Sequence, residues 1–359
     1  MADVSRVLLL GYGLAGRTFH APLIAAEPGL DVTTVVTADP ERRAQALADL
    51  PHARILATAE EALADPTAYD LVVVATANSA HVPQARAALE RGLSVVVDKP
   101  LAGTAREAIE LIDMAESRGL QLHVFQNRRW DSEILTARRL IDEGLLGRVH
   151  RWESRFERWR PTPKGGWREQ GSAEDLPGLL YDLGAHLVDQ SLHVVGPVEA
   201  VVASVRAVRE GMTTDDDTQV LLWHTSGAVS ILSVSSVSAF IEPRLRVLGT
   251  RGGLEITGLD TQEDALRAGR IPTDPGWGVE PEAAVARLVG ADGPEAQIVE
   301  RSRGAWQEYY AGVVRSLRGE SAPPVDPRDV VANLRVIEAA AESARSGSVV
   351  RLDPPAAHS

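Results

Sequence analysis

The first 125 residues alternate short apolar, β-branched runs with stretches of helical periodicity, and this alternation constrains the fold more than any other feature. Strands are predicted at 6–13, 30–37, 53–57, 70–76, 94–100 and 120–127, with helices between them that include 39–50 and 104–119. Strands this continuously apolar are typical of a parallel sheet covered by helices on both faces. In such a sheet, ligands bind beyond the carboxyl ends of the strands.

A glycine motif, "GYGLAG", follows the first predicted strand and precedes a predicted helix. It places Gly11, Gly13 and Gly16 in the spacing G-x-G-x-x-G, which in this context indicates the dinucleotide-binding loop of a Rossmann domain. The backbone N–H groups at Leu14, Ala15 and Gly16 would then face the phosphates at the positive end of the helix. The alternative is a glycine-rich turn that binds no ligand.

The end of the second predicted strand, "VVTADPERR", bears on which dinucleotide is bound. NAD-binding domains usually carry an acid here for the ribose diol, whereas NADP requires a nearby cation instead. Thr37 and Ala38 occupy the acid positions, and Asp39, one residue later, is expected to cap the following helix. Arg42 and Arg43 lie in the first turn, where they could contact a 2′-phosphate; otherwise they form a solvated helix face. The pattern favours NADP, with NAD as the alternative.

After residue 125 the pattern changes to helices mixed with predicted antiparallel hairpins, which turn at 226–227 and 252–253. The segment 259–300 is rich in glycine, proline and acids and has no clear periodicity. The predicted fold is therefore an α/β Rossmann domain over 1–125 followed by an α+β domain over 126–359 with a largely antiparallel, open sheet.

Composition excludes several classes of protein. The formal net charge is −13, from 37 basic and 50 acidic side chains, which argues against binding to nucleic acids or anionic membranes. There is no cysteine, so disulfides and thiolate chemistry are excluded. No run reaches the ~18 apolar residues of a membrane span, and the N-terminal stretch lacks the features of a signal peptide. We therefore expect a cytoplasmic protein.

Two acids and two histidines recur in "LLYDLGAHLVDQSLHVVG", residues 179–196. Asp182, His186, Asp189 and His193 have offsets that would place them along one helical face. Three interpretations remain open from the pattern alone. The residues could bind a metal ion, Asp182 and His186 could transfer protons, or the side chains could have structural roles in an amphipathic helix.

Several motifs together resemble the Gfo/Idh/MocA family of NAD(P)-dependent oxidoreductases, over nearly the whole chain. "GYGLAGRTFHAPLI" resembles its N-terminal fingerprint, "TANSAH" its T-P-N-x-x-H segment and "DKP" its E-K-P. "GWRE" and "GLLYDLGAHLVD" resemble its W-R and G-G-G-x-L-x-D-x-G-x-H stretches, and "NRRWD" resembles a branch that acts on inositols and related polyols. The chain departs from the family at Asp98 for Glu, Ala77 for Pro, and "LPG" at 176–178 for most of the triple glycine.

The resemblance implies that Lys99 lies beside the nicotinamide and hydrogen-bonds the reacting hydroxyl group. His186 would accept the proton, since a neutral imidazole titrates near pH 7. Asp182 would orient the substrate or stabilise the charged imidazole. No metal ion is expected in this mechanism.

The resemblance also implies the binding residues. Besides the glycine loop, Thr37, Arg42 and Arg43, the expected cofactor contacts are Thr76, Asn78, His81, Asp98, Lys99, Pro100, Trp167 and Arg168. Besides the three catalytic candidates, the expected substrate contacts are Asn127, Arg128, Trp159, Arg160, Lys164 and Tyr181. For each substrate contact, plain packing or surface exposure is the alternative.

The expected function is NADP(H)-dependent hydride transfer at a secondary alcohol or ketone of a sugar, inositol or related polyol. Two alternatives remain: a sugar–sugar oxidoreductase that retains its cofactor between turnovers, and a non-catalytic NAD(P)-binding regulator. Members of the family commonly associate through the sheet of the second domain. The resemblance therefore implies a homodimer or homotetramer whose substrate is a small molecule.

Overall fold

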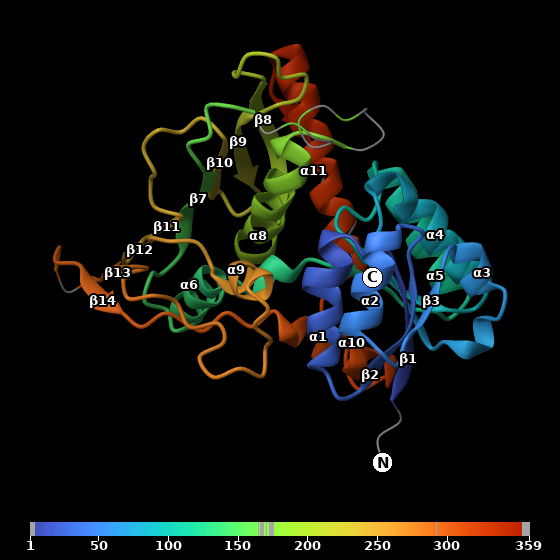
Figure 1. Ribbon diagram of the computed structural model, residues 1–359. Coiled ribbons are helices and arrows are strands. Elements are labelled where there is room, and N and C mark those ends of the chain that lie inside the picture. Colours follow the sequence, from blue (N-terminus) through green and yellow to red (C-terminus); the bar gives the residue numbers. More distant parts are fainter. Residues whose placement is uncertain are drawn as a thin grey trace. The chain divides into compact units, whose positions relative to one another are not determined.

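The computed structural model describes residues 4–163, 165, 169, 171, 176–291 and 293–353. These residues form two compact units (Figure 1). Unit 1 comprises 1–130, 261–278 and 305–330, and unit 2 comprises 131–260, 279–304 and 331–359. In the described part of the chain, no helix is both long enough and apolar enough to cross a membrane.

Unit 1 contains a six-stranded parallel sheet, sheet A, in the order β3-β2-β1-β4-β5-β6. Its strands are β1 (Ser5–Leu10), β2 (Leu30–Val36), β3 (Arg54–Leu56), β4 (Leu71–Val74), β5 (Ser94–Asp98) and β6 (Leu122–Phe125). All four residues of β4 and of β6 are buried, as expected for strands covered on both faces. The predicted Rossmann architecture is confirmed.

The helices of unit 1 are η1 (Ala15–His20), α1 (Ala21–Ala25), α2 (Pro40–Asp49), α3 (Ala59–Leu63), η2 (Pro66–Ala68), α4 (Asn78–Glu90), α5 (Ala105–Ser117), η3 (Asn127–Trp130), α9 (Gln262–Arg267) and α10 (Gln307–Leu317). Two of them, α2 and α5, begin at N-caps that the sequence predicts. The carboxylate of Asp39 accepts a hydrogen bond from the Arg42 amide at 2.9 Å, and the Thr104 hydroxyl accepts one from Glu107. Both predicted N-caps are confirmed.

Unit 2 contains a nine-stranded mixed sheet, sheet B, in the order β14-β13-β12-β11-β7-β10-β9-β8-β15. Its strands are β7 (Val149–Glu157), β8 (Val198–Arg206), β9 (Asp217–His224), β10 (Val229–Ser235), β11 (Leu245–Gly249), β12 (Gly253–Ile256), β13 (Ala286–Val289), β14 (Gln297–Val299) and β15 (Val350–Arg351). Neighbours pair antiparallel except β7 and β10, so the predicted largely antiparallel sheet is confirmed.

One face of sheet B carries the core of unit 2. Helices α6 (Ser132–Asp142), α8 (Ala185–Val195) and most of α11 (Pro327–Ser346) contribute to this core together with alternate residues of the central strands. Val220 and Leu222 of β9 are buried in it, so the intervening Leu221 lies on the opposite face. The segment 259–300, which had no clear pattern, supplies α9, strand β13 and the edge strand β14.

Candidate active site

The glycine loop between β1 and η1 is packed tightly against its own neighbours. A Cβ on Gly11, whose φ is +96°, would lie 2.5 Å from the carbonyl oxygen of Ala75. A Cβ on Gly16 would lie 2.1 Å from the carbonyl oxygen of Gly11. These two positions therefore require glycine for close packing of strand and helix, as the motif predicts.

Gly13 differs because space is left beside it. The nearest side-chain atom to a Cβ there would be Nη1 of Arg42, at 3.6 Å. Arg42 is exposed, and its guanidinium has no hydrogen bond or ion pair with the described residues. Thr37, at the end of β2, is buried and carries no charge. A glycine cradle beside an unneutralised cation fits the phosphates of a dinucleotide.

The turn after β5 carries Lys99. The Lys99 amide donates to Oδ1 of Asp98 at 2.7 Å, and the Lys99–Pro100 peptide is cis. His81, from α4, lies behind this turn with only 1% of its surface exposed. Its Nδ1 is 2.8 Å from the Pro100 carbonyl oxygen, and its Nε2 is 3.3 Å from that of Thr76. Burial lowers the pKa of His81, so the ring is neutral.

The residues expected to contact the cofactor from unit 1 therefore gather at one edge of sheet A. The glycine loop follows β1, Thr37 and α2 follow β2, Thr76 and Asn78 follow β4, and Lys99 follows β5. All are carboxyl ends of neighbouring parallel strands. The chain reverses its strand order between β1 and β4, and this switch point is where such sheets bind ligands.

The other two catalytic candidates belong to unit 2. Asp182 lies in a π-helical turn, η5 (Leu180–Gly184), which runs directly into α8 and its residue His186. His186 is 5% exposed, and Asp182 is partly buried. The other π-helical segment of the chain's described residues is η1, at the glycine loop. π-Turns occur frequently at functional sites, so their position supports both assignments.

A small cavity of about 100 Å³ opens at Asp182. Arg160, another predicted substrate contact, also lines it. Among the described residues, no group of three histidines, cysteines or acids could hold a metal ion. The side chains that line this cavity include the cations Arg160 and Arg209 and the acids Glu169 and Asp215, so its groups are hydrogen-bonding and ionic.

Two residues of this cavity were missed by the sequence analysis. Asp215 accepts a hydrogen bond from the Leu180 amide at 2.8 Å and thereby caps η5. Burial raises the pKa of Asp215. Arg209 is buried and bridges Asp216 at 2.8 Å and Glu169 at 2.9 Å. The acidic run at 215–217 was the available clue, but charge runs are usually solvated and it was not singled out.

Other predicted substrate contacts have varied surroundings. Arg128, in η3 of unit 1, is nearly buried and pairs with Glu263 at 2.5 Å. Asn127 beside it is buried. Trp159, in unit 2, is 56% exposed. Tyr181 is partly buried, and burial raises its pKa. Lys164, Trp167 and Arg168 lie outside the described residues.

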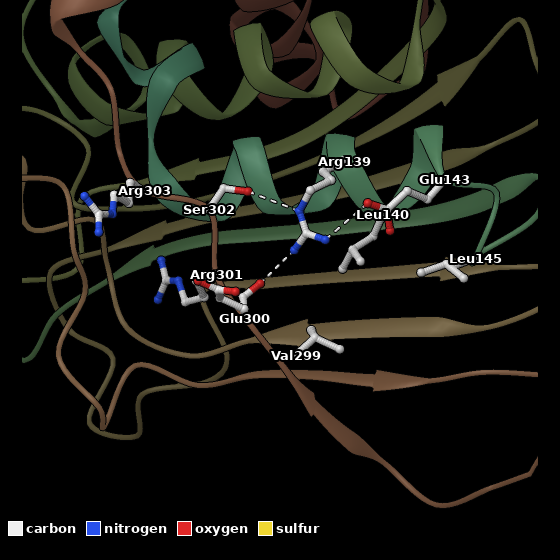
Figure 2. A pocket seen from close by; sticks show the side chains of 9 residues that line it. All are labelled: Arg139, Leu140, Glu143, Leu145, Val299, Glu300, Arg301, Ser302 and Arg303. Carbon is white, nitrogen blue, oxygen red and sulfur yellow. Dashed lines mark hydrogen bonds and ion pairs between the residues drawn. The ribbon is translucent and has the colours of Figure 1, made fainter.

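A larger cavity of unit 2, of about 550 Å³, contains none of the predicted residues. Figure 2 shows its side chains, which come from α6 and the turn that follows it, and from the end of β14 and the segment that follows it. Arg139 there bonds the Ser302 hydroxyl, the Glu300 carbonyl and the Glu143 carboxylate. Its guanidinium is thus satisfied by the protein itself, and the cavity is a weaker candidate than the one at Asp182.

Comparison with known proteins agrees with this geometry. Residues 5–126 match the description "Oxidoreductase family, NAD-binding Rossmann fold", and residues 138–352 match "Oxidoreductase family, C-terminal alpha/beta domain". The chain is 34% identical to scyllo-inositol 2-dehydrogenase (NADP(+)) IolW from Bacillus subtilis, over 98% of this chain and 97% of that protein. It is 27% identical to D-xylose 1-dehydrogenase (NADP(+)) 2 from Haloferax volcanii, over 92% of this chain and 99% of that protein.

Solved structures give the same result. The yvaA protein from Bacillus subtilis superposes with a TM-score of 0.92 at 34% identity, over 98% of this chain and 99% of that one. Both domains match the models of one family, and the relatives and the solved structure match nearly the whole chain. These matches agree with the motifs noted in the sequence. The chain belongs to the Gfo/Idh/MocA family of oxidoreductases.

Proposed function

We propose that this oxidoreductase uses NADP(H) to interconvert a secondary alcohol and a ketone in an inositol, a sugar or a related polyol. The observation that carries the proposal is the arrangement at the carboxyl edge of sheet A. Arg42 lies beside the Gly13 cradle, and Lys99 follows β5 on the other side of the switch point. An extended dinucleotide along this edge would have its 2′-phosphate near Arg42 and its nicotinamide near Lys99.

The bound nicotinamide would supply the hydride chemistry. The protein's part is to position the substrate and move the proton. Lys99 hydrogen-bonds the reacting oxygen, and His186 accepts the hydroxyl proton during oxidation and returns it during reduction. Asp182 orients the hydroxyl groups of the substrate or stabilises the imidazolium. In this proposal residues 1–125 bind the cofactor, and residues 126–359 bind the substrate.

We also propose that two copies associate through the face of sheet B opposite its core. Leu221 pairs with Ile231 on this face, and Trp223 pairs with Val229. Beside these apolar pairs, the buried Glu153 lies 2.9 Å from Arg155 and 3.2 Å from Arg246. Apolar cross-strand pairs beside these ion pairs of Glu153 suit a self-complementary interface between two copies.

A substrate screen tests the proposed activity. The purified protein is assayed with scyllo-inositol, other inositols and common sugars, each with NADP and with NAD. The proposal predicts turnover with at least one polyol, faster with NADP. The Lys99→Met variant should lose most of this turnover while it still binds NADPH, because the glycine loop is unchanged. Unchanged turnover in this variant would refute the assigned role of Lys99.

A further inference from the structure

A buried chain of polar groups lies behind the turn that carries Lys99. His20, at the end of η1, is fully buried. Its Nδ1 lies 2.6 Å from the hydroxyl of Tyr310, in α10, and its Nε2 lies 3.7 Å from Oδ2 of Asp98. The other carboxylate oxygen of Asp98 accepts the Lys99 amide at 2.7 Å. Tyr310, His20 and Asp98 thus lie one after another behind the Lys99 backbone within unit 1, and the contact between His20 and Asp98 is an electrostatic one that is longer than a hydrogen bond.

The geometry determines the tautomer of His20. A neutral imidazole has one N–H, and a carboxylate can only accept. The proton therefore belongs on Nε2, where it faces Asp98, and Nδ1 must accept from Tyr310. Burial is the main cause that raises the pKa of Tyr310 well above its usual value, and the neighbouring Tyr309 and Asp98 raise it further. The Tyr310 hydroxyl thus keeps its proton and can donate it.

Packing holds the His20 ring in this orientation. The centroid of Phe125 lies 4.3 Å from that of His20 and 6.0 Å from that of Tyr310. Tyr309 packs edge-on against Phe125 at 4.9 Å. Because rings this closely packed cannot reorient freely, the hydrogen-bonding partners of His20 decide which nitrogen is protonated.

Asp98 stays charged in this environment. Burial alone would raise its pKa, but the neighbouring His20, His81 and Lys99 together bring it below the usual value. A carboxylate charged at the base of the turn accepts the hydrogen bond of the Lys99 amide and so holds the backbone from which that side chain extends.

We infer that Tyr310 and His20 are positioning residues for Lys99: the Tyr310 hydroxyl sets the tautomer of His20, and His20 in turn holds the Asp98 carboxylate against the Lys99 amide. The inference rests on the proposed function insofar as Lys99 takes part in the reaction. Without the Tyr310 hydroxyl, the ring can carry its proton on Nδ1. The Nε2 lone pair would then face the carboxylate, and that repulsion would loosen the turn.

The test compares Tyr310→Phe with Tyr309→Phe. Both remove one buried hydroxyl from adjacent positions of α10, but the Tyr309 hydroxyl has no hydrogen-bond partner among the described residues. Nitrogen NMR of the imidazoles in cofactor-free protein reports the tautomer of His20. We expect protonated Nε2 in the wild type and in Tyr309→Phe, and a mixture of tautomers in Tyr310→Phe.

Kinetics supply the second measurement. The loss of one such hydrogen bond, ~1 kcal/mol, corresponds to about a fivefold lower kcat in Tyr310→Phe. KM for NADP should stay unchanged because the glycine loop is intact, and Tyr309→Phe should keep the wild-type kcat. Protonated Nδ1 in the wild type, or equal losses of kcat in the two variants, would overturn the inference. If Lys99→Met retains full turnover, the proposed role of Lys99 in the reaction fails, but the NMR result still decides the tautomer claim.

Discussion

In the proposed function, Arg42 is the residue on which the choice of cofactor depends. Its guanidinium lies beside Gly13 without an acidic partner among the described side chains. Asp39 serves as the N-cap of α2, since its carboxylate accepts a hydrogen bond from the Arg42 amide. Thus Asp39, the acid nearest the ribose position, is used as the cap of α2. The guanidinium of Arg42 is available for a phosphate.

Replacement of Arg42 by alanine should weaken NADP binding selectively. A charge-assisted hydrogen bond to phosphate contributes ~1.5–3 kcal/mol, so KM for NADP should rise about 10- to 100-fold while KM for NAD changes little. Steady-state kinetics with both cofactors measures this change. Arg106→Ala, on the exposed surface of α5, is the control and should leave both constants unchanged. A parallel rise of both constants in Arg42→Ala would argue against a 2′-phosphate contact.

His123 gives the fold a pH dependence. It is fully buried in β6, and burial lowers its pKa from 6.5 to about 4. Below pH 6.5 the unfolded chain binds a proton here that the folded chain does not, so stability falls as pH falls. By linkage, His123 should account for about 2 kcal/mol of the stability lost between pH 7.5 and pH 5.

Urea denaturation at the two pH values measures this loss. His123→Leu should shrink the difference in unfolding free energy by about that amount. His150→Gln, at an exposed position of β7, should leave the difference as in the wild type. A pH dependence that is the same in His123→Leu as in the wild type would contradict the assignment.

At the scale of elements, the turn into η5 shows how a departure from the family motif is accommodated. Where the family has three glycines, this chain has "LPG" at 176–178. The backbone is nonetheless left-handed at Leu176, with φ +50°, and at Gly178, with φ +93°. The turn thus keeps a left-handed course at a leucine, a conformation that is uncommon for a bulky residue.

A side chain at position 178 would also meet a neighbouring residue of this turn. A Cβ there would lie 1.9 Å from Oδ1 of Asp215, the acid that caps η5. Gly178→Ala should therefore displace Asp215, lower the melting temperature and reduce turnover. Gly196→Ala is the matched control, because φ there is +101° but nothing lies within 4 Å of the added Cβ. If both variants lose equal stability and activity, the clash with Asp215 has no separate effect.

Local sequence patterns predicted elements well where caps and strand periodicity act over a few residues. Asp39 and Thr104 marked the starts of α2 and α5, and the strands of sheet A differ from prediction by a few residues at their ends. The π-turn at Asp182 was not predicted, because the apolar spacing of that stretch also fits a regular helix. Strands β13 and β14 were missed, since β13 is a strand through its pairing with β12 and β14 through its pairing with β13.

The residues of the candidate site also fall into two groups, those that local sequence predicts and those that it does not. The glycine motif and the cation at Arg42 follow from local chemistry, whereas Lys99, Asp182 and His186 were assigned by resemblance to the family. Tyr310 lies 290 residues from His20, and no local pattern relates such distant positions. Arg209 and Asp215 were missed for the same reason, because their partners are set by tertiary packing.

At the scale of the whole molecule, the apolar pairs on sheet B predict a dimer. Leu221→Arg should place a charge among these pairs and shift the protein to monomers, because burial of an unpaired charge opposes association. Analytical ultracentrifugation measures the mass. Leu47→Arg, at an exposed position of α2, should sediment as the wild type does. A wild-type monomer, or an unchanged oligomer in Leu221→Arg, would contradict the proposed interface.

The central claim is that hydride passes between a polyol carbon and NADP on this chain. The most direct measurement uses a polyol from the screen, scyllo-inositol first, with deuterium on the carbons that bear hydroxyl groups. After reaction with NADP, NMR of the reduced cofactor locates the label. The account predicts deuterium at C4 of the nicotinamide in NADPH. NADPH without deuterium, or no reduction of NADP with any polyol tested, would contradict it.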